Sequence, residues 1–224
     1  MIPLGMLASA RVPPSGGTLT ATWLGGTQFQ DTSGATKTYS NVPLGPASDA
    51  RTVVVAVGIR VGNGGLIASV TIAGVTATID AQPSPHASVA LARAQVPASA
   101  GTSGTVVITK FSNEWVFGIL GVWHIDAPVA VTDSDWVYVG SGTGTMSRTL
   151  TTSPGGVVLA AAGGYGSATW TWAGAAERLD ANPYTNISGT AADAATTGAD
   201  LTISVTPSAA PTSRGLAVAT YSLT

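Results

Sequence analysis

Side chains able to do chemistry are few in this chain of 224 residues, which contains two His, no Cys and eleven Asp or Glu. His124 and Asp126 lie two positions apart in a stretch with strand character, so both would face the same side and could bind a metal ion. A stable site needs about three or four protein ligands, and no further one lies nearby in the sequence. We therefore expect His124 to be hydrogen-bonded at a strand end, and we predict no metal site.

Asp133 and Asp135 flank Ser134 and could supply oxygen atoms to calcium. Calcium takes about six to eight oxygen ligands, and the spacing here is not that of an EF-hand loop. Clustered Asp and Ser residues are typical of turns, because their side chains hydrogen-bond to the nearby backbone. The cluster is therefore predicted to form a turn.

Nucleophilic catalysis has no evident machinery in the sequence. The motif G-x-S-x-G is absent, and only His86 and His124 could act as an imidazole base. His86 ends the turn sequence Pro-Ser-Pro-His at 83–86. The glycine-rich stretch 163–166 lacks the Lys and the following helix of a phosphate-binding loop. We predict no catalytic residue and no cofactor site, and hence a protein that is not an enzyme.

A hydrolase is the alternative in a different functional class. Glycoside hydrolysis requires two carboxyl groups at a defined separation, which could come from Glu114, Glu177 and the aspartates. Nothing in the spacing of these residues brings two of them together. This alternative therefore requires Glu114, Asp126 or Glu177 to lie in a cleft with a shifted pKa.

Aromatic residues offer a second alternative, a carbohydrate-binding module. Trp170 and Trp172 alternate with threonines, so they would share one face of a strand. If that face were open, they could form a platform for sugar rings together with Tyr165 and Tyr184, which would then be the glycan or partner surface. If it were closed, the tryptophans would be part of a sandwich core.

A short charged patch follows these tryptophans. Three of the four residues from Glu177 to Asp180 are charged, in a chain with only 9% charged residues. The patch is interpreted either as an ion pair at a strand edge that fixes register or as a contact with a partner subunit.

The elements that must position these residues are short strands. Runs of Val, Ile, Ala and Thr are interrupted by Gly, Pro, Asn and Asp about every ten residues. This pattern predicts an all-β protein, an antiparallel β-sandwich that is jelly-roll-like, with an extended N-terminal arm. Residues 1–18 form the arm, and residues 19–224 form a single β-sandwich domain, or two closely packed β-lobes. Strands are expected at 36–44, 52–61, 67–72, 75–79, 89–96, 105–110, 115–125, 129–139, 145–150, 157–162, 169–172, 201–205 and 216–223.

Two details of this assignment are specific. Thr52 to Val61 is nearly continuous in Val, Ala and Ile, which indicates a central strand buried on both faces. Ala73-Gly74 predicts a hairpin, while the Ala-rich segment from Ala191 to Ala195 is predicted to be a loop or a single turn. The second half repeats the first only loosely.

Composition limits the partners. The net charge is −2 and no basic stripe exists, so nucleic acid is excluded as a partner. No apolar run is long enough for a transmembrane helix, so no membrane contact is expected. A surface with so little charge promotes association, which favours a protein that works in an assembly.

The first residues point to such an assembly. Met1, Ile2, Leu4, Met6 and Leu7 are large and apolar, and the intervening Pro and Gly oppose a helix. The arm could dock on its own sandwich or insert into a neighbouring copy. We expect insertion of this assembly arm into a neighbouring copy, in a homo-oligomer of closed cyclic symmetry, and we predict a trimer for an appendage.

Several segments together resemble a β-sandwich module of tailed-bacteriophage and prophage virion proteins, across residues 19–224. They lie at 39–45, 51–57, 70–78, 118–123 and 169–180, and the most specific is the pattern W-x-G-x-x-E-R-x-D from Trp172 to Asp180. The resemblance implies a non-enzymatic structural component of the virion, such as a fibre, a tail-tip protein or a head-surface appendage that contacts the host. A head decoration protein that stabilises the capsid is the alternative within this class. The implied partners are copies of the chain itself, other virion proteins and a host-surface glycan.

Overall fold

The computed structural model describes residues 17–31, 34–59, 66–83, 89–111, 116–184 and 187–224. This part of the chain is all-β, as predicted, with one short 3-10 helix at Ala98–Ala100. No helix in these ranges is both long and apolar enough to cross a membrane. The strands of the first half are β1 (Ala21–Asp31), β2 (Thr36–Pro43), β3 (Thr52–Ile59), β4 (Ile67–Ile72), β5 (Val75–Thr76), β6 (Thr78–Ala81), β7 (Val89–Gln95), β8 (Ser103–Lys110) and β9 (Val116–Ile125).

The second half contributes eight strands. They are β10 (Val129–Ser141), β11 (Met146–Leu150), β12 (Pro154–Tyr165), β13 (Trp170–Ala173), β14 (Ala176–Tyr184), β15 (Ile187–Thr197), β16 (Leu201–Pro207) and β17 (Thr212–Leu223).

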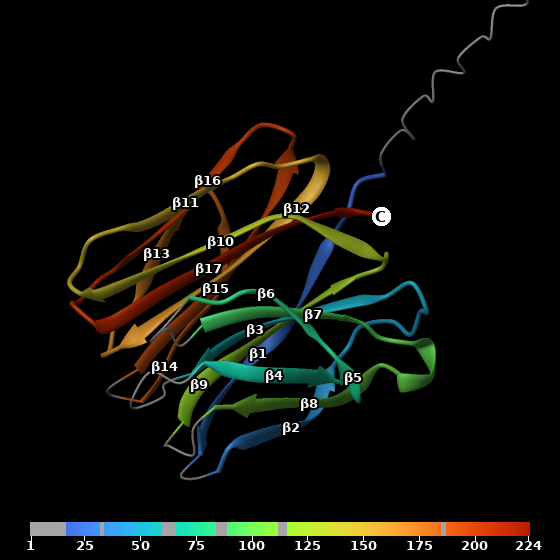
Figure 1. Ribbon diagram of the computed structural model, residues 1–224, viewed down its shortest axis with the longest axis horizontal. Helices are drawn as coiled ribbons and strands as arrows, with labels where there is room; N and C mark the ends of the chain where they lie inside the picture. The colour runs from blue at the N-terminus through green and yellow to red at the C-terminus, as the bar shows by residue number, and fades with distance from the viewer. Residues whose placement is uncertain (1–16, 32–33, 60–65, 84–88, 112–115, 185–186) are drawn as a thin grey trace, which may run out of the picture.

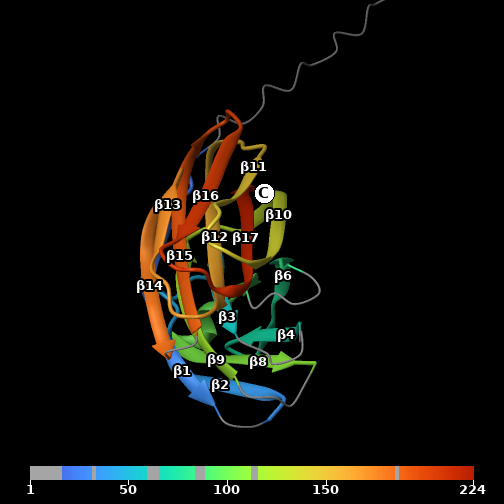
Figure 2. The same cartoon turned by 90° about the vertical axis from the view of Figure 1, so that its left-hand side faces the viewer.

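These strands form four antiparallel sheets that stack as two sandwiches (Figure 1). In the first sandwich, sheet A has the order β1-β9-β3-β7-β6 and faces sheet B, with the order β2-β8-β4-β5. In the second, sheet C has the order β10-β17-β12-β15-β14 and faces sheet D, with the order β11-β16-β13. Sheets A and C lie back to back in the middle of the stack, and sheets B and D are its outer layers (Figures 1 and 2).

The two sandwiches have the same connectivity. If β1, β2, β3 and β4 are matched with β10, β11, β12 and β13, and β6 to β9 with β14 to β17, the strand orders of sheets A and C coincide, as do those of sheets B and D apart from β5. The repeat is visible in the sequence, because V-T-I-A-G at 70–74 corresponds to W-T-W-A-G at 170–174. In both copies an Asp follows six residues after this Gly, at Asp80 and at Asp180. The described part of the chain is thus a tandem pair of antiparallel β-sandwiches.

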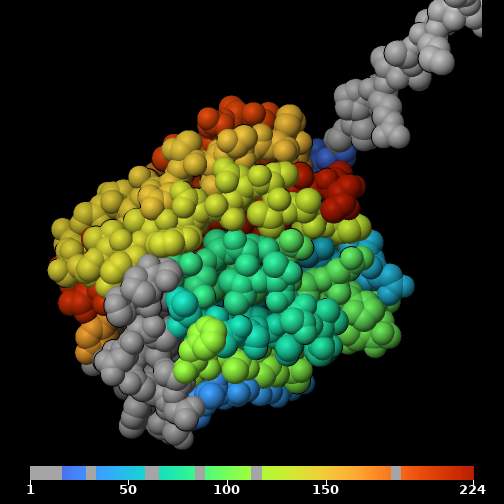
Figure 3. All heavy atoms as spheres, in the orientation of Figure 1, coloured from blue at the N-terminus to red at the C-terminus, as the bar shows by residue number. Residues whose placement is uncertain are grey.

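A single β-sandwich domain, or two closely packed β-lobes, was predicted for residues 19–224, and the described part of the chain has three layers of core. One core lies between sheets A and B, one between sheets C and D, and the third joins sheets A and C. The third core contains Val54 and Trp123 from the first sandwich and Leu159 and Tyr221 from the second. The space-filling view shows the two sandwiches directly against each other (Figure 3). The arrangement corresponds to the alternative of two closely packed lobes.

Burial between two cores explains the continuous apolar runs. In β3, Val53 and Val55 belong to the first core while Val54 and Ala56 belong to the shared core, and all four are fully buried. The prediction of a central strand at this position is confirmed. An alternating pattern would require one face of the strand to meet water, and this strand has no such face.

The segment Ala191–Ala195 was predicted to be a loop or a turn, and this is wrong. It lies in β15, which pairs with β12 on one side and with β14 on the other. Small residues fit there because sheet C is enclosed between sheets A and D, and Ala191 and Ala192 are fully buried. Short side chains thus replace the Val and Ile that usually mark a strand.

The hairpin predicted at Ala73-Gly74 is confirmed, with Ile72 opposite Val75. Both turn residues have positive φ, 51° at Ala73 and 81° at Gly74. The strand expected at 75–79 is divided, however. Its first residues pair in sheet B, and the chain then crosses to the edge of sheet A as β6.

Polar contacts also join the two sandwiches. The Trp123 indole donates a hydrogen bond of 2.7 Å to Asp193, which accepts two more from Arg178 at 2.8 and 2.9 Å. On the other side of the junction, the Tyr221 hydroxyl donates to Asp80 at 3.0 Å, and Arg93 lies 3.1 Å from the same carboxylate. Each carboxylate thus has one partner from its own sandwich and one from the other.

Candidate binding groove

A groove of about 500 Å³ lies at one side of the first sandwich. It lies between β1, the edge strand of sheet A, and β2, the edge strand of sheet B. Its apolar lining residues Val42, Leu120 and Val122 are buried members of the first core, while Thr27, Gln28, Thr38 and Ser40 at its rim are exposed. The remaining lining residues are Leu24, Gly25, Gly26, Lys37, Tyr39, Asn41 and Pro43.

Backbone irregularities shape both walls. The register between β1 and β9 shifts between Trp23 and Gly25, and Gly25 has a φ of 123°. The register between β2 and β8 shifts between Tyr39 and Val42, where Asn41 has a φ of 56°. Gly and Asn are the residues that adopt positive φ at least cost, so the sequence permits both bulges. A bulge bends its strand, and the residues of both bulges line the groove.

Small and polar side chains leave the core uncovered here. Gly25 pairs with Val122 and Thr27 pairs with Leu120 across the β1–β9 ladder. Directly opposite residues share a face of the sheet, so Gly25 and Thr27 face sheet B together with these two core residues. Neither is large or apolar enough to extend the core to the strand edge.

The equivalent side of the second sandwich is closed. There Asp135 pairs with Val218 and Val137 with Leu216 on β10, the edge strand of sheet C that corresponds to β1. Val137 packs against the core of its sandwich, and Asp135 forms an ion pair of 2.9 Å with Arg148 from the facing sheet.

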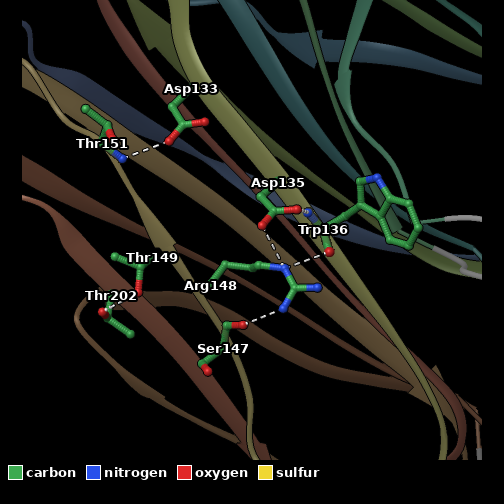
Figure 4. A network of polar contacts seen from close by, with 8 residues as sticks. All are labelled: Asp133, Asp135, Trp136, Ser147, Arg148, Thr149, Thr151 and Thr202. Atoms are coloured by element: carbon green, nitrogen blue, oxygen red, sulfur yellow. Dashed lines mark hydrogen bonds and ion pairs between the residues drawn. The ribbon is translucent and has the colours of Figure 1, made fainter.

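Further hydrogen bonds strengthen this closure (Figure 4). Arg148 also donates to the carbonyl oxygen of Trp136 at 2.8 Å, and the Thr151 amide donates to Asp133 at 2.7 Å. Both contacts join the edge of sheet C to strand β11 or to the residue that follows it. The turn predicted for Asp133 to Asp135 is wrong, because these residues lie inside β10, and their carboxylates bind protein groups.

The charge of the groove is low. Lys37 is the only charged residue in its lining, and its ammonium nitrogen lies 6.0 Å from the centre of the Tyr39 ring. This distance is at the outer limit of a cation–π contact. The groove therefore presents an apolar floor, a hydroxyl and amide rim, and the free edges of two strands.

The tryptophan platform expected for sugar binding is not formed. Trp170 is 3% exposed and belongs to the core between sheets C and D. Trp172 is half-buried against the same core, and its indole donates to the Thr190 hydroxyl at 2.7 Å. Both point into the sandwich because Thr171 takes the outward position of β13. Tyr165 is 36% exposed, and the side chain of Tyr184 lies outside the described residues.

His124 and Asp126 were considered as a pair of metal ligands, and in the described ranges no three His, Asp or Glu side chains lie close enough together to hold a metal ion. His124 is buried with its ring against Gly45, and a Cβ at that glycine would lie 2.6 Å from the imidazole. Burial lowers the pKa of His124, with Asp126 opposing and Arg51 adding to the shift. Asp126 itself is exposed, so the two residues differ in environment.

The carboxylates of the hydrolase alternative are separated as well. Burial, and then the nearby Asp180, raise the pKa of Glu177, but this residue is exposed and lines neither the groove nor the smaller hollow beside Asp126. Burial also raises the pKa of Asp180, which accepts a hydrogen bond from the Trp170 amide. Glu114 lies outside the described residues, as does His86. In the charged patch, Arg178 pairs with Asp193 on the neighbouring strand, which agrees with an ion pair at a strand edge.

The arm residues Met1, Ile2, Leu4, Met6 and Leu7 also lie outside the described residues. The groove was not recognised from the sequence, since Thr36 to Leu44 indicated only a strand and no strand was assigned to 21–31. Comparison of the chain with models of protein families, with curated proteins and with solved structures finds no match.

Proposed function

We propose that this protein is a non-enzymatic structural component of a tailed-phage or phage-like particle, present in several copies as a fibre, tail-tip protein or head-surface appendage. The resemblance of its sequence segments to virion proteins supports this class. The distribution of charge over the molecule is the observation that carries the proposal.

Charged side chains are used to hold the sheets together. Arg51 is fully buried and donates to five backbone carbonyl groups, at Gly45, Pro46, Val96, Pro97 and Gly101. Arg93, Arg148 and Arg178 each pair with a carboxylate on a neighbouring strand or on the facing sheet. Arg51, Lys110, Asp193 and Arg214 are buried, so part of the small charge of this chain is internal, whereas most proteins keep such residues on their surface.

The outer face of sheet D carries threonine hydroxyl groups and few charges. Thr149 and Thr202 are paired across β11 and β16 by a hydroxyl bond of 2.8 Å, and Thr145 and Thr206 by one of 2.7 Å. Thr171 continues this face on β13, opposite Thr206. Arg148 is the only charged residue described in these three strands, and it turns towards Asp135.

Such a surface suits a permanent assembly. Packing two neutral hydroxyl faces together requires no desolvation of charges, which is the costly step in burying an ion. On a free monomer, such a face carries too little charge to keep copies of the chain apart by repulsion. The sugar-binding alternative loses its main support because Trp170 is in the core.

Mass spectrometry of particles purified through a density gradient tests the proposal. We expect the chain at several copies per particle, in constant ratio to the major capsid protein across the gradient. Immunogold labelling of the same particles then distinguishes the head from the tail. A chain that stays at the top of the gradient, separate from the particles, refutes the proposal.

A further inference from the structure

We propose that the groove between β1 and β2 receives the N-terminal arm of a neighbouring copy, as an extended strand added to the free edge of β1. The inference rests on the proposed function, which supplies the neighbouring copies. It names the groove as the surface that binds the arm, and the sequence of the arm is known.

The first argument is the difference between the two halves of the tandem repeat. On the corresponding edge strand, β10, the second sandwich has Asp135 and Val137, which close the side of the sandwich with the help of Arg148. The first has Gly25 and Thr27, and buried core residues line an open groove. Since the fold is the same, closure is available to this architecture, and its absence in the first sandwich is a local feature of β1.

The second argument is the backbone. In the described residues β1 pairs only with β9 and β2 only with β8, so each has a free edge at the groove. The bulge in β2 interrupts its edge at Ser40 and Asn41, whereas β1 is regular from Gly25 to Asp31. An incoming strand would thus find its hydrogen-bonding partners on β1, in the manner of β-augmentation. A Cβ at Gly25 would have no atom within 4 Å, so space is open beside this strand.

The third argument is the sequence of the arm. Ile2, Leu4 and Met6 alternate with Pro3 and Gly5, so an extended arm would place the three large side chains on one face. The apolar floor at Val42, Leu120 and Val122 is what such a face requires. Pro3 lacks an amide hydrogen and is tolerated on an added edge strand. The arm has no charged side chain before Arg11, which agrees with the low charge of the groove.

The position of Gly17 favours a neighbour over the chain's own arm. Gly17 lies beside Leu223, and Leu19 donates to Gly155 at 2.7 Å, so β1 enters from the second sandwich. An arm that folded back along β1 as a tight hairpin would place about residues 5–8 beside Gly25 to Gln28, with roughly one residue pairing per 3.3 Å of strand. Ile2 and Leu4 would then lie beyond the groove. An arm from another copy has no such restriction.

Disulfide trapping tests the inference, because the chain contains no Cys. One full-length protein carries Leu4→Cys, and a second, with an affinity tag, carries Thr27→Cys at the exposed groove rim. The two are mixed under mild oxidation and separated on a non-reducing gel. The matched control replaces Thr27→Cys by Thr149→Cys, an exposed threonine on the outer face of sheet D.

We expect the mixed dimer to form at least tenfold faster with Thr27→Cys than with Thr149→Cys. Adding Ile2→Asp to the Leu4→Cys protein should remove most of this difference, while circular dichroism of the variants shows an unchanged β-sheet spectrum. Equal rates for the two partners overturn the inference. So does a chain carrying both Leu4→Cys and Thr27→Cys that closes only an internal disulfide at every concentration.

The assay uses purified protein without particles. Equal trapping rates in a protein that is abundant in particles would therefore overturn the groove assignment alone. Strong trapping in a protein that is absent from particles would overturn the proposed function and leave the arm–groove contact in place.

Discussion

Stability of the molecule should depend on pH through one carboxyl group at the junction of the two sandwiches. The side chain of Asp80 is 2% exposed, between Arg93 of its own sheet and Tyr221 of the other sandwich. Burial raises the pKa of Asp80 to about 6 from 3.8, although Arg93 and the Tyr221 hydroxyl both lower it. The folded protein therefore binds a proton at Asp80 more tightly than the unfolded chain does.

The sign and size follow from this difference. A carboxyl group whose folded pKa is raised contributes stability at low pH, and this contribution is lost as pH rises through the folded pKa. Complete protonation below pH 3.8 is worth about 3 kcal/mol from a shift of this size. Between pH 7.5 and pH 5, the free energy of unfolding should gain about 1.4 kcal/mol from this group.

Urea unfolding at pH 5 and pH 7.5 measures this gain. Asp80→Asn cannot titrate, so its difference between the two pH values should be smaller than that of the wild type by about 1.4 kcal/mol. Tyr221→Phe removes a hydrogen bond that favours the charged form of Asp80, so the pKa of Asp80 should rise further. The free energy of unfolding should then vary with pH up to a higher pH than in the wild type. An Asp80→Asn protein with the wild-type pH dependence would refute the reasoning.

Three substitutions test other parts of the framework by denaturant unfolding. Trp123→Phe removes the hydrogen bond to Asp193 across the junction and should cost about 1.5–3 kcal/mol, because the acceptor is charged; no loss would mean that water replaces the indole. Arg51→Met leaves five carbonyl groups without their donor and should cost more than about 3 kcal/mol, and a fully stable variant would contradict its role as a staple. Arg148→Ala removes a partly exposed ion pair, so the free energy of unfolding should fall by only about 1 kcal/mol or less. A larger loss would show that this ion pair is needed to stabilise the core of the second sandwich.

Local patterns predicted the strands well where side chains were large. The Val-rich run of β3 and the Ala73-Gly74 hairpin were recognised because burial on both faces and positive φ leave direct marks in the sequence. The strand β15 was missed, since Ala and Thr fit a thin layer between two sheets without showing period two. The division into two sandwiches was only an alternative in the sequence analysis, because strand patterns do not tell which sheet a strand joins, although the shared segment at 70–74 and 170–174 was available as a signal.

The candidate groove could not be predicted from the sequence, for a different reason. The sequence analysis looked for clusters of side chains that could do chemistry, and most of the polar side chains proved to be structural. Asp135 forms an ion pair with Arg148. Asp193 accepts hydrogen bonds from Trp123 and Arg178. The groove is open because Gly25 and Thr27 lack the large apolar side chains that would extend the core to the strand edge. Such an absence becomes visible only when the fold supplies equivalent positions for comparison.

The tandem repeat thus acts as an internal reference for function. Features that both sandwiches share, such as the strand order of their sheets and the Ala-Gly pairs at 73–74 and 173–174, are accounted for by the shared fold. Positions that differ need a separate cause. On β1 the contacts that close the side of the second sandwich are absent, and buried core residues line a groove there. A bound strand would restore the missing layer, and the arm of a neighbouring copy is the apolar segment that this chain has to offer.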